Sequence, residues 1–459
     1  MLRHRDGGET PKMASKWRRI KGSIARAPLR PLIFAFVLLG TTRAALRAQD
    51  TPRSTAADSA ARADSLLARL ERAEAAIKLM REQLNAQAGS AVQSRSRAGL
   101  EFSGRVFMNA FVNSGRSNNI DVPQVAVAPA VGAGYQDRSA GASFRQTTLA
   151  LSAQGGKLWG ADASAFVEGD FFGGVQSGAG GRKLFPEPRL RIARATLKWS
   201  DVELMVGQDV PLITPIEPTS VASTGAPEFA VAGNLWFWLP QIRATMEFAG
   251  PVRIALQGAL LAPWSGGDIL AGDADAADIG ERQRLPMVQT RVRARWGMDE
   301  TEGEVGLGVH YGLLGTAADT SLVSFAVALS WRVPVASWLD VRGEAYAGQM
   351  LKGLGGGGAG QNFGTNALAQ TVPMRDVGGW LQLNFKPDAT WQIGGGAGRS
   401  EPNKDDRPVR QRNDAFEVHA TWRPGGLPFI GVELREIQST YAAGLFRTRQ
   451  VNLAVGVEF

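Results

Sequence analysis

Apolar and polar residues alternate along most of the chain from residue 100 to its end. In the last ten residues, QVNLAVGVEF, one parity holds Val451, Leu453, Val455, Val457 and Phe459, and the other holds polar or small residues. Successive side chains of a β-strand point to opposite faces of the sheet. This stretch therefore predicts a strand with one apolar face and one polar face.

The same pattern predicts sixteen strands. We expect them at Leu100–Asn113, Ser143–Gln154, Gly160–Phe171, Leu190–Ser200, Val202–Gln208, Gln241–Ala249, Val252–Ala262, Pro286–Trp296, Glu302–Tyr311, Thr320–Val333, Trp338–Leu351, Asp376–Lys386, Trp391–Arg399, Arg412–Trp422, Phe429–Thr440 and Thr448–Phe459. The number is even, as single-chain bacterial membrane barrels require.

The connections between these segments alternate between long and short along the chain. The long ones are 114–142, 172–189, 209–240, 263–285, 312–319, 352–375, 400–411 and 441–447. Short periplasmic turns and long outer loops produce this pattern when both termini are periplasmic, whereas a soluble β-sandwich has no reason to sort its loops. We therefore predict an all-β membrane protein, with residues 99–459 forming a 16-stranded antiparallel transmembrane β-barrel. We expect this barrel to lie among the lipids of the outer membrane of a Gram-negative-type bacterium.

The N-terminal segment 1–48 has the features of an export signal. A basic region precedes a short apolar core, Leu32–Leu39, and small residues follow, with cleavage expected after Ala44 or Ala48 and translation starting at Met1 or Met13. A membrane anchor is the alternative. Eleven of the 51 Lys and Arg and two of the 43 Asp and Glu lie in 1–48, so the remainder has 40 basic and 41 acidic residues. The positive net charge therefore belongs to the signal and gives no reason to expect a nucleic-acid partner.

Residues 49–98 predict a periplasmic helix and a flexible linker. Apolar residues spaced alternately by four and three form a coiled-coil seam of Leu66, Leu70, Ala73, Ile77, Met80 and Leu84. An isolated helix of this length is marginal, so we expect self-association into a homotrimer. A single amphipathic helix lying on its own barrel is the alternative.

Strand parity places many charged side chains in the lumen. The expected pore-lining residues are Arg194, Lys198, Arg243, Arg291, Arg293, Arg295, Arg342, Glu168, Asp170 and Glu344. An arginine facing lipid at mid-membrane costs roughly 2–4 kcal/mol, so these residues indicate a water-filled interior. About half of the charges should form structural pairs. The ladder of Arg291, Arg293 and Arg295 is the best candidate for attracting anions, since its own strand has no acid.

The third long connection, 209–240, differs from the others. It is rich in proline, contains Asp209, Glu217 and Glu228, and ends in the aromatic run Leu235–Trp238. These aromatic residues either belong to an inward loop or form an interface girdle leading into the next strand.

No pattern indicates catalysis, a metal or a cofactor. The chain has no cysteine, which excludes disulfides and thiolate metal sites. Beyond the signal only His310 and His419 remain, both on the lumen parity and neither in a catalytic motif. We therefore expect a protein that is not an enzyme.

Several short motifs resemble the DcaP-like trimeric porins of the outer membrane. They are Phe144-Arg145-Gln146, the run Glu168–Gly173, Arg189-Leu190-Arg191, Val206-Gly207-Gln208 and Pro240-Gln241-Ile242-Arg243. The resemblance implies a signal peptide, a periplasmic coiled coil, a trimer of sixteen-stranded barrels, a third loop that narrows the channel, and small organic anions such as dicarboxylates as solutes. It also implies that the barrel assembly machinery reads Phe459 as an assembly signal.

The function expected from this resemblance is passive diffusion of small hydrophilic solutes across the outer membrane. A structural or adhesive barrel with ligand-binding outer loops is the alternative.

Overall fold

The structure, a computed structural model, describes Lys78, the backbone of Val92–Gln93 and residues 99–129, 137–173, 186–270, 277–298, 301–316 and 320–459. The predicted signal peptide (1–48) and the coiled-coil seam Leu66, Leu70, Ala73, Ile77, Met80 and Leu84 lie outside the described residues. Both therefore remain predictions. The account below concerns the compact unit Leu79–Phe459.

Nearly all regular structure in the described part is β-strand. The strands are β1 (Val92–Gln93), β2 (Gly99–Asn113), β3 (Ser139–Ser143), β4 (Thr148–Leu158), β5 (Ala161–Asp170), β6 (Arg189–Lys198), β7 (Val202–Asp209), β8 (Leu239–Phe248), β9 (Val252–Leu261), β10 (Met287–Trp296), β11 (Gly303–Gly315), β12 (Ser321–Ala336), β13 (Leu339–Gln349), β14 (Phe363–Thr365), β15 (Thr371–Pro373), β16 (Arg375–Phe385), β17 (Trp391–Pro402), β18 (Arg410–Trp422), β19 (Pro428–Tyr441) and β20 (Gly444–Glu458). Short helical turns, η1 (Glu281–Gln283), η3 (Lys352–Leu354), α3 (Gly357–Gly360) and η4 (Lys404–Asp406), lie in the long connections.

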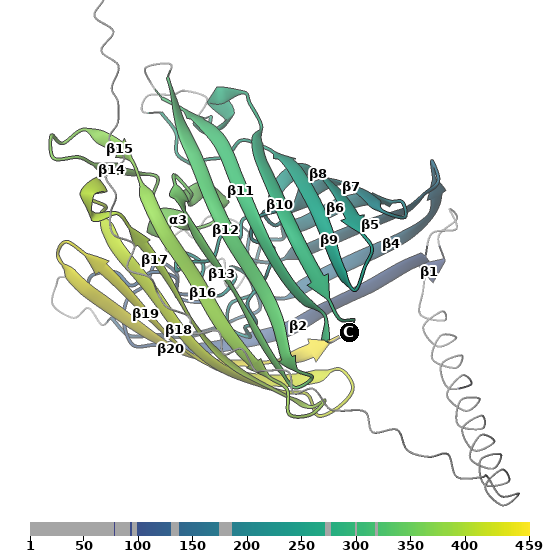
Figure 1. Cartoon of the computed structure of the whole chain (residues 1–459). Coiled ribbons are helices and arrows are strands. Elements are labelled where there is room, and N and C mark those ends of the chain that lie inside the picture. Colours follow the sequence, from purple (N-terminus) through teal and green to yellow (C-terminus); the bar gives the residue numbers. More distant parts are fainter. Residues whose placement is uncertain are drawn as a thin grey trace, which may run out of the picture. The chain divides into compact units, whose positions relative to one another are not determined.

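The strands form a closed antiparallel barrel, as the sequence predicts. The wall strands pair in chain order, with β13 next to β16 because β14 and β15 form a separate hairpin. β20 pairs with β2 from Arg105↔Glu458 to Asn113↔Gln450, which closes the wall (Figure 1). Two of the 18 strands in the described sheet, β1 and β3, are short additions beside β2, so the wall has sixteen. Closure leaves no unpaired strand edge, which a lipid environment requires.

The predicted second strand, Ser143–Gln154, is interrupted. β3 pairs with the outer half of β2, and β4 pairs with its other half. Between them, Arg145 and Gln146 do not take part in the strand pairing. Both are buried, with 2% and 1% of their surfaces exposed. Alternation did not reveal this break, because it arises from contacts with a distant loop.

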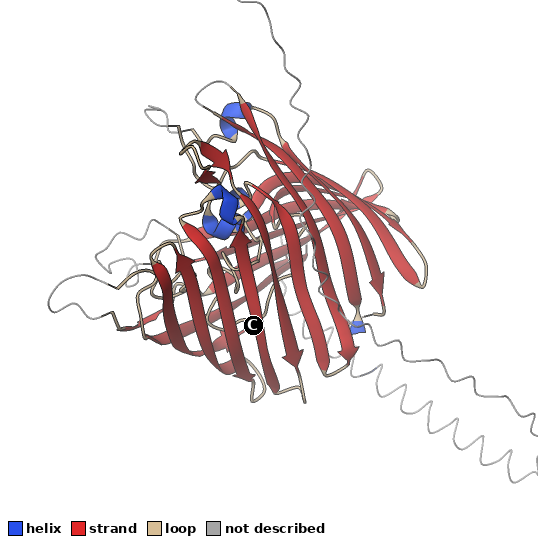
Figure 2. Cartoon of the chain, turned by 60° about the vertical axis from the view of Figure 1, so that its left-hand side comes forward, coloured by secondary structure: helices blue, strands red, loops and turns tan. Residues whose placement is uncertain are grey.

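The barrel has its apolar side chains outside and its polar side chains inside. On β10, for example, Val288 and Val292 are 39% and 51% exposed, whereas Gln289 and Arg291 are 0% and 3% exposed. This arrangement is the reverse of a soluble protein and suits a wall surrounded by lipid. Figure 2 shows the strands that make up this wall side by side.

Aromatic side chains pair where the short turns join neighbouring strands. Trp338 lies against Phe385, and Trp391 lies against Trp422, with ring centroids 5.5 and 6.3 Å apart. Such pairs are typical of the interface girdle of membrane barrels. Among the described residues, no helix is long and apolar enough to cross a membrane.

Candidate functional site

Segment 209–240 runs inside the barrel and follows its wall; we call it the inward loop. Its first part crosses from β7 to the opposite strands. The backbone nitrogen of Leu212 donates to Gln289 Oε1 of β10 at 2.7 Å. The backbone nitrogen of Thr219 donates to Gln382 Oε1 of β16 at 2.8 Å, and the Gln382 amide donates back to the Thr219 carbonyl. Wall side chains thus satisfy the backbone of a buried loop, as burial requires.

The next turn of the inward loop bonds to β19 and β2, the two strands that pair with β20. Glu433 Oε2 of β19 accepts hydrogen bonds from Ser220 Oγ at 2.7 Å and from the backbone nitrogens of Val221 and Ala222. Asn109 of β2 donates to the Val221 carbonyl at 2.8 Å. The loop is therefore held beside the barrel seam by the two strands that flank β20.

Gln146, in the break between β3 and β4, forms hydrogen bonds with the next residues of the inward loop. Its Oε1 accepts from the backbone nitrogens of Thr224 and Gly225 at 2.6 and 3.0 Å, and its Nε2 donates to the Ala222 carbonyl at 2.8 Å. The break between β3 and β4 thus lies where the Gln146 side chain points inward and binds the loop.

The returning half of the loop makes an aromatic contact with the barrel wall. Phe229 stacks on Trp380 of β16, with ring centroids 5.6 Å apart. Beside it, Glu228 is fully buried and forms an ion pair with Arg435 of β19 at 2.9 Å. Burial raises the pKa of the Glu228 carboxyl, and Arg435 opposes that shift.

The three arginines of the predicted ladder all have acidic partners on other strands, Glu304 on β11 and Glu247 on β8. Arg291 and Arg295 share the two oxygens of Glu304, at 2.7 and 2.8 Å, and Arg293 pairs with Glu247 at 2.6 Å. The absence of an acid on β10 itself therefore does not leave the ladder uncompensated. Only Arg295 has substantial exposure, with 31% of its side chain accessible.

A second group of predicted pore-lining residues surrounds Asp209 at the start of the loop. Its carboxylate pairs with Arg194 at 2.8 Å and with Arg243 at 3.5 Å. Lys198 is exposed at the turn end of β6.

The predicted acids of β5 lie opposite arginines of β6. Asp170 pairs with Arg189 at 2.6 Å, and Glu168 with Arg191 at 3.3 Å.

On β13, Arg342 and Glu344 have different environments. Arg342 pairs with Asp340 at 2.8 Å and donates to the Glu217 carbonyl of the loop. Glu344 is buried and accepts from the backbone of Ile216 and from the Trp380 indole. Glu344 thus supports the loop, whereas Arg342 faces open space.

A cavity of about 490 Å³ remains beside the inward loop and is lined by residues of β2, β4, β5, β6, β13 and β20. We call it the lumen cavity. Its charged lining side chains are Arg105, Glu168, Arg191, Glu217, Arg342 and Glu458. Arginines and glutamates are equal in number, so the lining resembles a mixed-charge constriction more than a uniformly basic one.

Glu217 is the acid that the loop contributes to this cavity. Its side chain is exposed to the cavity, but the surrounding wall limits its hydration. This desolvation raises the pKa of Glu217; Arg191 opposes the shift, and Glu168 and Asp209 add to it.

Several residues that position the loop were not singled out from the sequence. Asn109, Gln382 and Glu433 lie on the lumen parity of their strands, and that parity was the available signal. Uncharged amides at lumen positions are as informative as charges, because they can bind a backbone that the barrel encloses.

The closed sixteen-stranded wall, the apolar exterior and the loop lying against the inner face define the fold of an outer-membrane porin. No protein-family model matches the sequence, and no curated protein matches it. Among solved structures, the outer membrane channel DcaP of Acinetobacter baumannii is similar, with 14% sequence identity, coverage of 80% of this chain and 99% of that chain, and a TM-score of 0.61. The anion-selective porin from Comamonas acidovorans has 11% identity, coverage of 79% and 100%, and a TM-score of 0.50. The predicted resemblance to DcaP-like porins is confirmed in the fold.

Proposed function

We propose that this protein is a passive diffusion channel of a bacterial outer membrane for small hydrophilic solutes. The principal support is the lumen cavity, which is lined by charged side chains and lies between the inward loop and the wall. Charged side chains facing a wet lumen, with an apolar exterior, are typical of porins. In this proposal Asp209 anchors the base of the loop, Glu217 lies at the constriction, and Glu228 fixes the returning half.

The test is the conductance of the purified barrel in planar bilayers. We expect stable single-channel steps, and we expect them to grow when Glu217 and Pro218 are replaced by smaller residues. A barrel that folds normally but never conducts would support the structural or adhesive alternative instead.

We further propose a preference for small organic anions, determined by Arg191 and Arg342 of the lumen cavity. The ladder arginines contribute less, because none of them lines the lumen cavity. Arg342→Gln should lower the anion-to-cation permeability ratio. Arg449→Gln is the matched control, since Arg449 is exposed and outside the cavity. Equal permeability of anions and cations in the unmodified protein would refute the preference.

We also propose that the barrel forms a homotrimer, with residues 49–98 as a periplasmic coiled coil. Chemical crosslinking of the detergent-solubilised protein, with and without residues 49–98, tests both statements. Trimers that require this segment are expected; a monomer in both cases contradicts the proposal.

A further inference from the structure

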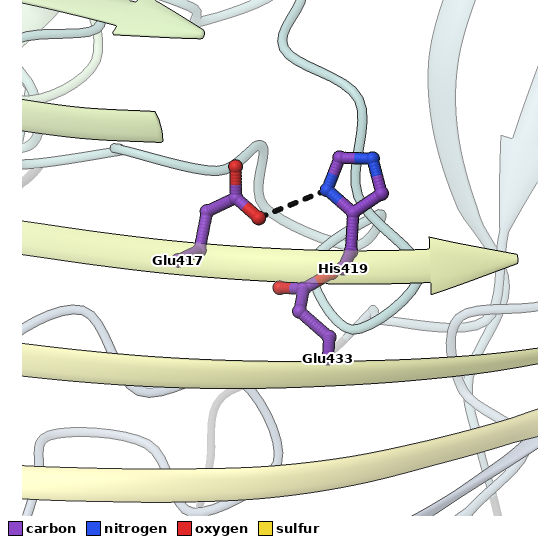
Figure 3. Close-up of side chains that lie close together, drawn as sticks. All are labelled: Glu417, His419 and Glu433. Atoms are coloured by element: carbon purple, nitrogen blue, oxygen red, sulfur yellow. Dashed lines mark hydrogen bonds and ion pairs between the residues drawn. The ribbon is translucent and has the colours of Figure 1, made fainter. Parts of the chain in front are cut away.

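A cluster of buried polar side chains lies where β18 and β19 meet the inward loop. Glu417 and His419 occupy alternate positions of β18 and share a face, and Glu433 is the cross-strand partner of His419. Figure 3 shows the three side chains together, two from one strand and one from the next. One ligating atom from each lies within 4.8 Å of the others, and all three residues are buried.

The hydrogen bonds of this cluster leave a carboxylate oxygen uncommitted. Glu417 Oε2 lies 2.9 Å from His419 Nδ1, and Glu417 Oε1 accepts from Gln382 at 2.8 Å. Glu433 Oε2 is occupied by the inward loop, but Glu433 Oε1 is buried without a hydrogen-bond partner. The Nε atom of Arg435 is 3.7 Å from it, which is too far for a hydrogen bond.

The buried charges near these side chains do not balance. Glu228, Glu417 and Glu433 contribute three carboxylates, and Arg435 contributes one guanidinium. With a neutral imidazole, the cluster has two negative charges in excess when all three carboxyl groups are ionised, and one in excess when Glu228 is protonated. Uncompensated buried charge is costly, and one divalent cation would neutralise it.

We propose that Glu417, His419 and Glu433 bind a divalent transition-metal ion of the zinc class. The ligands are Glu417 Oε2, His419 Nδ1 and Glu433 Oε1, a nitrogen-and-oxygen set with an open fourth position. Zinc bonds of about 2.0–2.2 Å place tetrahedral ligands roughly 3.3 Å apart, between the 2.9 Å contact and the 4.8 Å limit of this cluster. Imidazole ligation favours zinc over calcium and magnesium, which prefer oxygen alone.

The far side of the imidazole has the partner that a metal-binding histidine needs. His419 Nε2 and Asn384 Oδ1 are both buried without hydrogen bonds. They lie 2.6 and 2.9 Å from the position that a Cβ on Gly394 would occupy. A metal on Nδ1 would leave the proton on Nε2, which faces the same space at Gly394 as the Asn384 oxygen, a candidate for the outer partner that metal-bound histidines use. The glycine leaves room for this contact.

The bound ion would connect the wall to the inward loop. Glu433 binds the metal through one oxygen and binds Ser220, Val221 and Ala222 through the other. The role of the site is thus to fix the loop at the barrel seam. Because the cluster is buried, the ion must enter before the loop packs or when it moves.

The experiment uses full-length, tag-free protein unfolded and refolded in detergent with zinc chloride, then dialysed against metal-free buffer. We expect one equivalent of zinc per chain by mass spectrometry, with none retained by His419→Gln or Glu433→Gln. His310→Gln is the matched control: His310 is equally buried but bonded to Gln289 and Ser324. It should retain the metal.

Two readouts keep the test decisive if a variant misfolds. Cobalt in place of zinc should give the visible absorption of a four-coordinate site, and zinc should slow hydrogen exchange at the amides of Val221 and Ala222. Wild-type protein that refolds in zinc but retains none overturns the proposal. Equal retention by folded His419→Gln also overturns it, as does equal competition by magnesium or calcium.

Discussion

Glu304 Oε1 accepts a hydrogen bond from Arg291 at 2.7 Å in the interior of the barrel. Its other oxygen accepts from Arg295 at 2.8 Å, so one carboxylate bridges two members of the arginine ladder. Arg291 and Arg295 of β10 are therefore compensated by a single shared carboxylate on β11, the neighbouring strand of the wall.

Glu304→Gln should increase the preference of the channel for anions. The change removes the counter-charge of Arg291 and Arg295, and the more exposed Arg295 can then face the lumen. Breaking this buried pair should also lower the free energy of unfolding by roughly 3 kcal/mol. Reversal potentials in a salt gradient and urea unfolding measure the two effects. Glu302→Gln is the control, because Glu302 and its partners Arg253 and Arg332 are more exposed; an equal change there would contradict the explanation.

Gln146→Leu should loosen the inward loop. The backbone groups of Thr224, Gly225 and Ala222 lose their partner, which costs about 1–3 kcal/mol for a buried unsatisfied group. We expect a lower unfolding midpoint and more open-channel noise in single-channel recordings.

Gln392→Leu serves as the control for this change, since Gln392 accepts only a 3.4 Å bond from Arg423. Unaltered noise in a folded Gln146→Leu barrel would show that the loop does not depend on this residue.

Anion preference should rise as the pH falls. Burial raises the pKa of Glu217, so this carboxylate is neutralised at a higher pH than an ordinary glutamate. On acidification the lumen cavity then loses a negative charge while its arginines stay charged. Reversal potentials measured from mildly alkaline to acidic pH should follow this trend.

Glu217→Gln should show the higher preference already at neutral pH and a flatter pH profile. Glu281→Gln, in η1 of an outer loop, should behave like the unmodified protein. A Glu217→Gln profile identical to wild type would assign the titration to another group.

Removal of Phe459 should reduce assembly more than transport. Phe459 and Gly104 exchange two backbone hydrogen bonds, at 2.8 and 3.0 Å, and the Phe459 ring lies 5.5 Å from that of Phe102. The folded fraction on a heat-modifiability gel measures the effect. Phe385→Ala, which removes a rim aromatic with the same centroid distance to Trp338, controls for the loss of one ring. Normal folding without Phe459 would count against its role as an assembly signal.

The barrel wall was predictable because alternation is a local signal. The last strand, for example, was expected at Thr448–Phe459 and extends from Gly444 to Glu458. The break at Arg145 and Gln146 could not be predicted, since it depends on a loop that lies far away in the sequence. Parity shows to which face of the wall a side chain points, whereas strand register determines which side chains it contacts.

In the candidate site, too, the contacts between strands could not be predicted from the sequence. Parity placed Arg291 on the lumen side, but its pairing with Glu304 requires the relative positions of β10 and β11. Likewise, the spacing of Glu417 and His419 is visible in the sequence, whereas Glu433 joins them only through the register of β18 and β19.

The tethers of the inward loop have a consequence for the order of barrel biogenesis. Ser220 and its partner Glu433 are 213 positions apart, so the loop is synthesised long before the strand that holds it. Contacts of such sequence separation form late, because the intervening chain must first lose its freedom. A barrel halted before β19 inserts would have an open seam, and its loop would lack the hydrogen bonds to Glu433. The last strands therefore complete the wall and the attachment of the loop together, so an assembly defect in these strands should appear as a misplaced constriction.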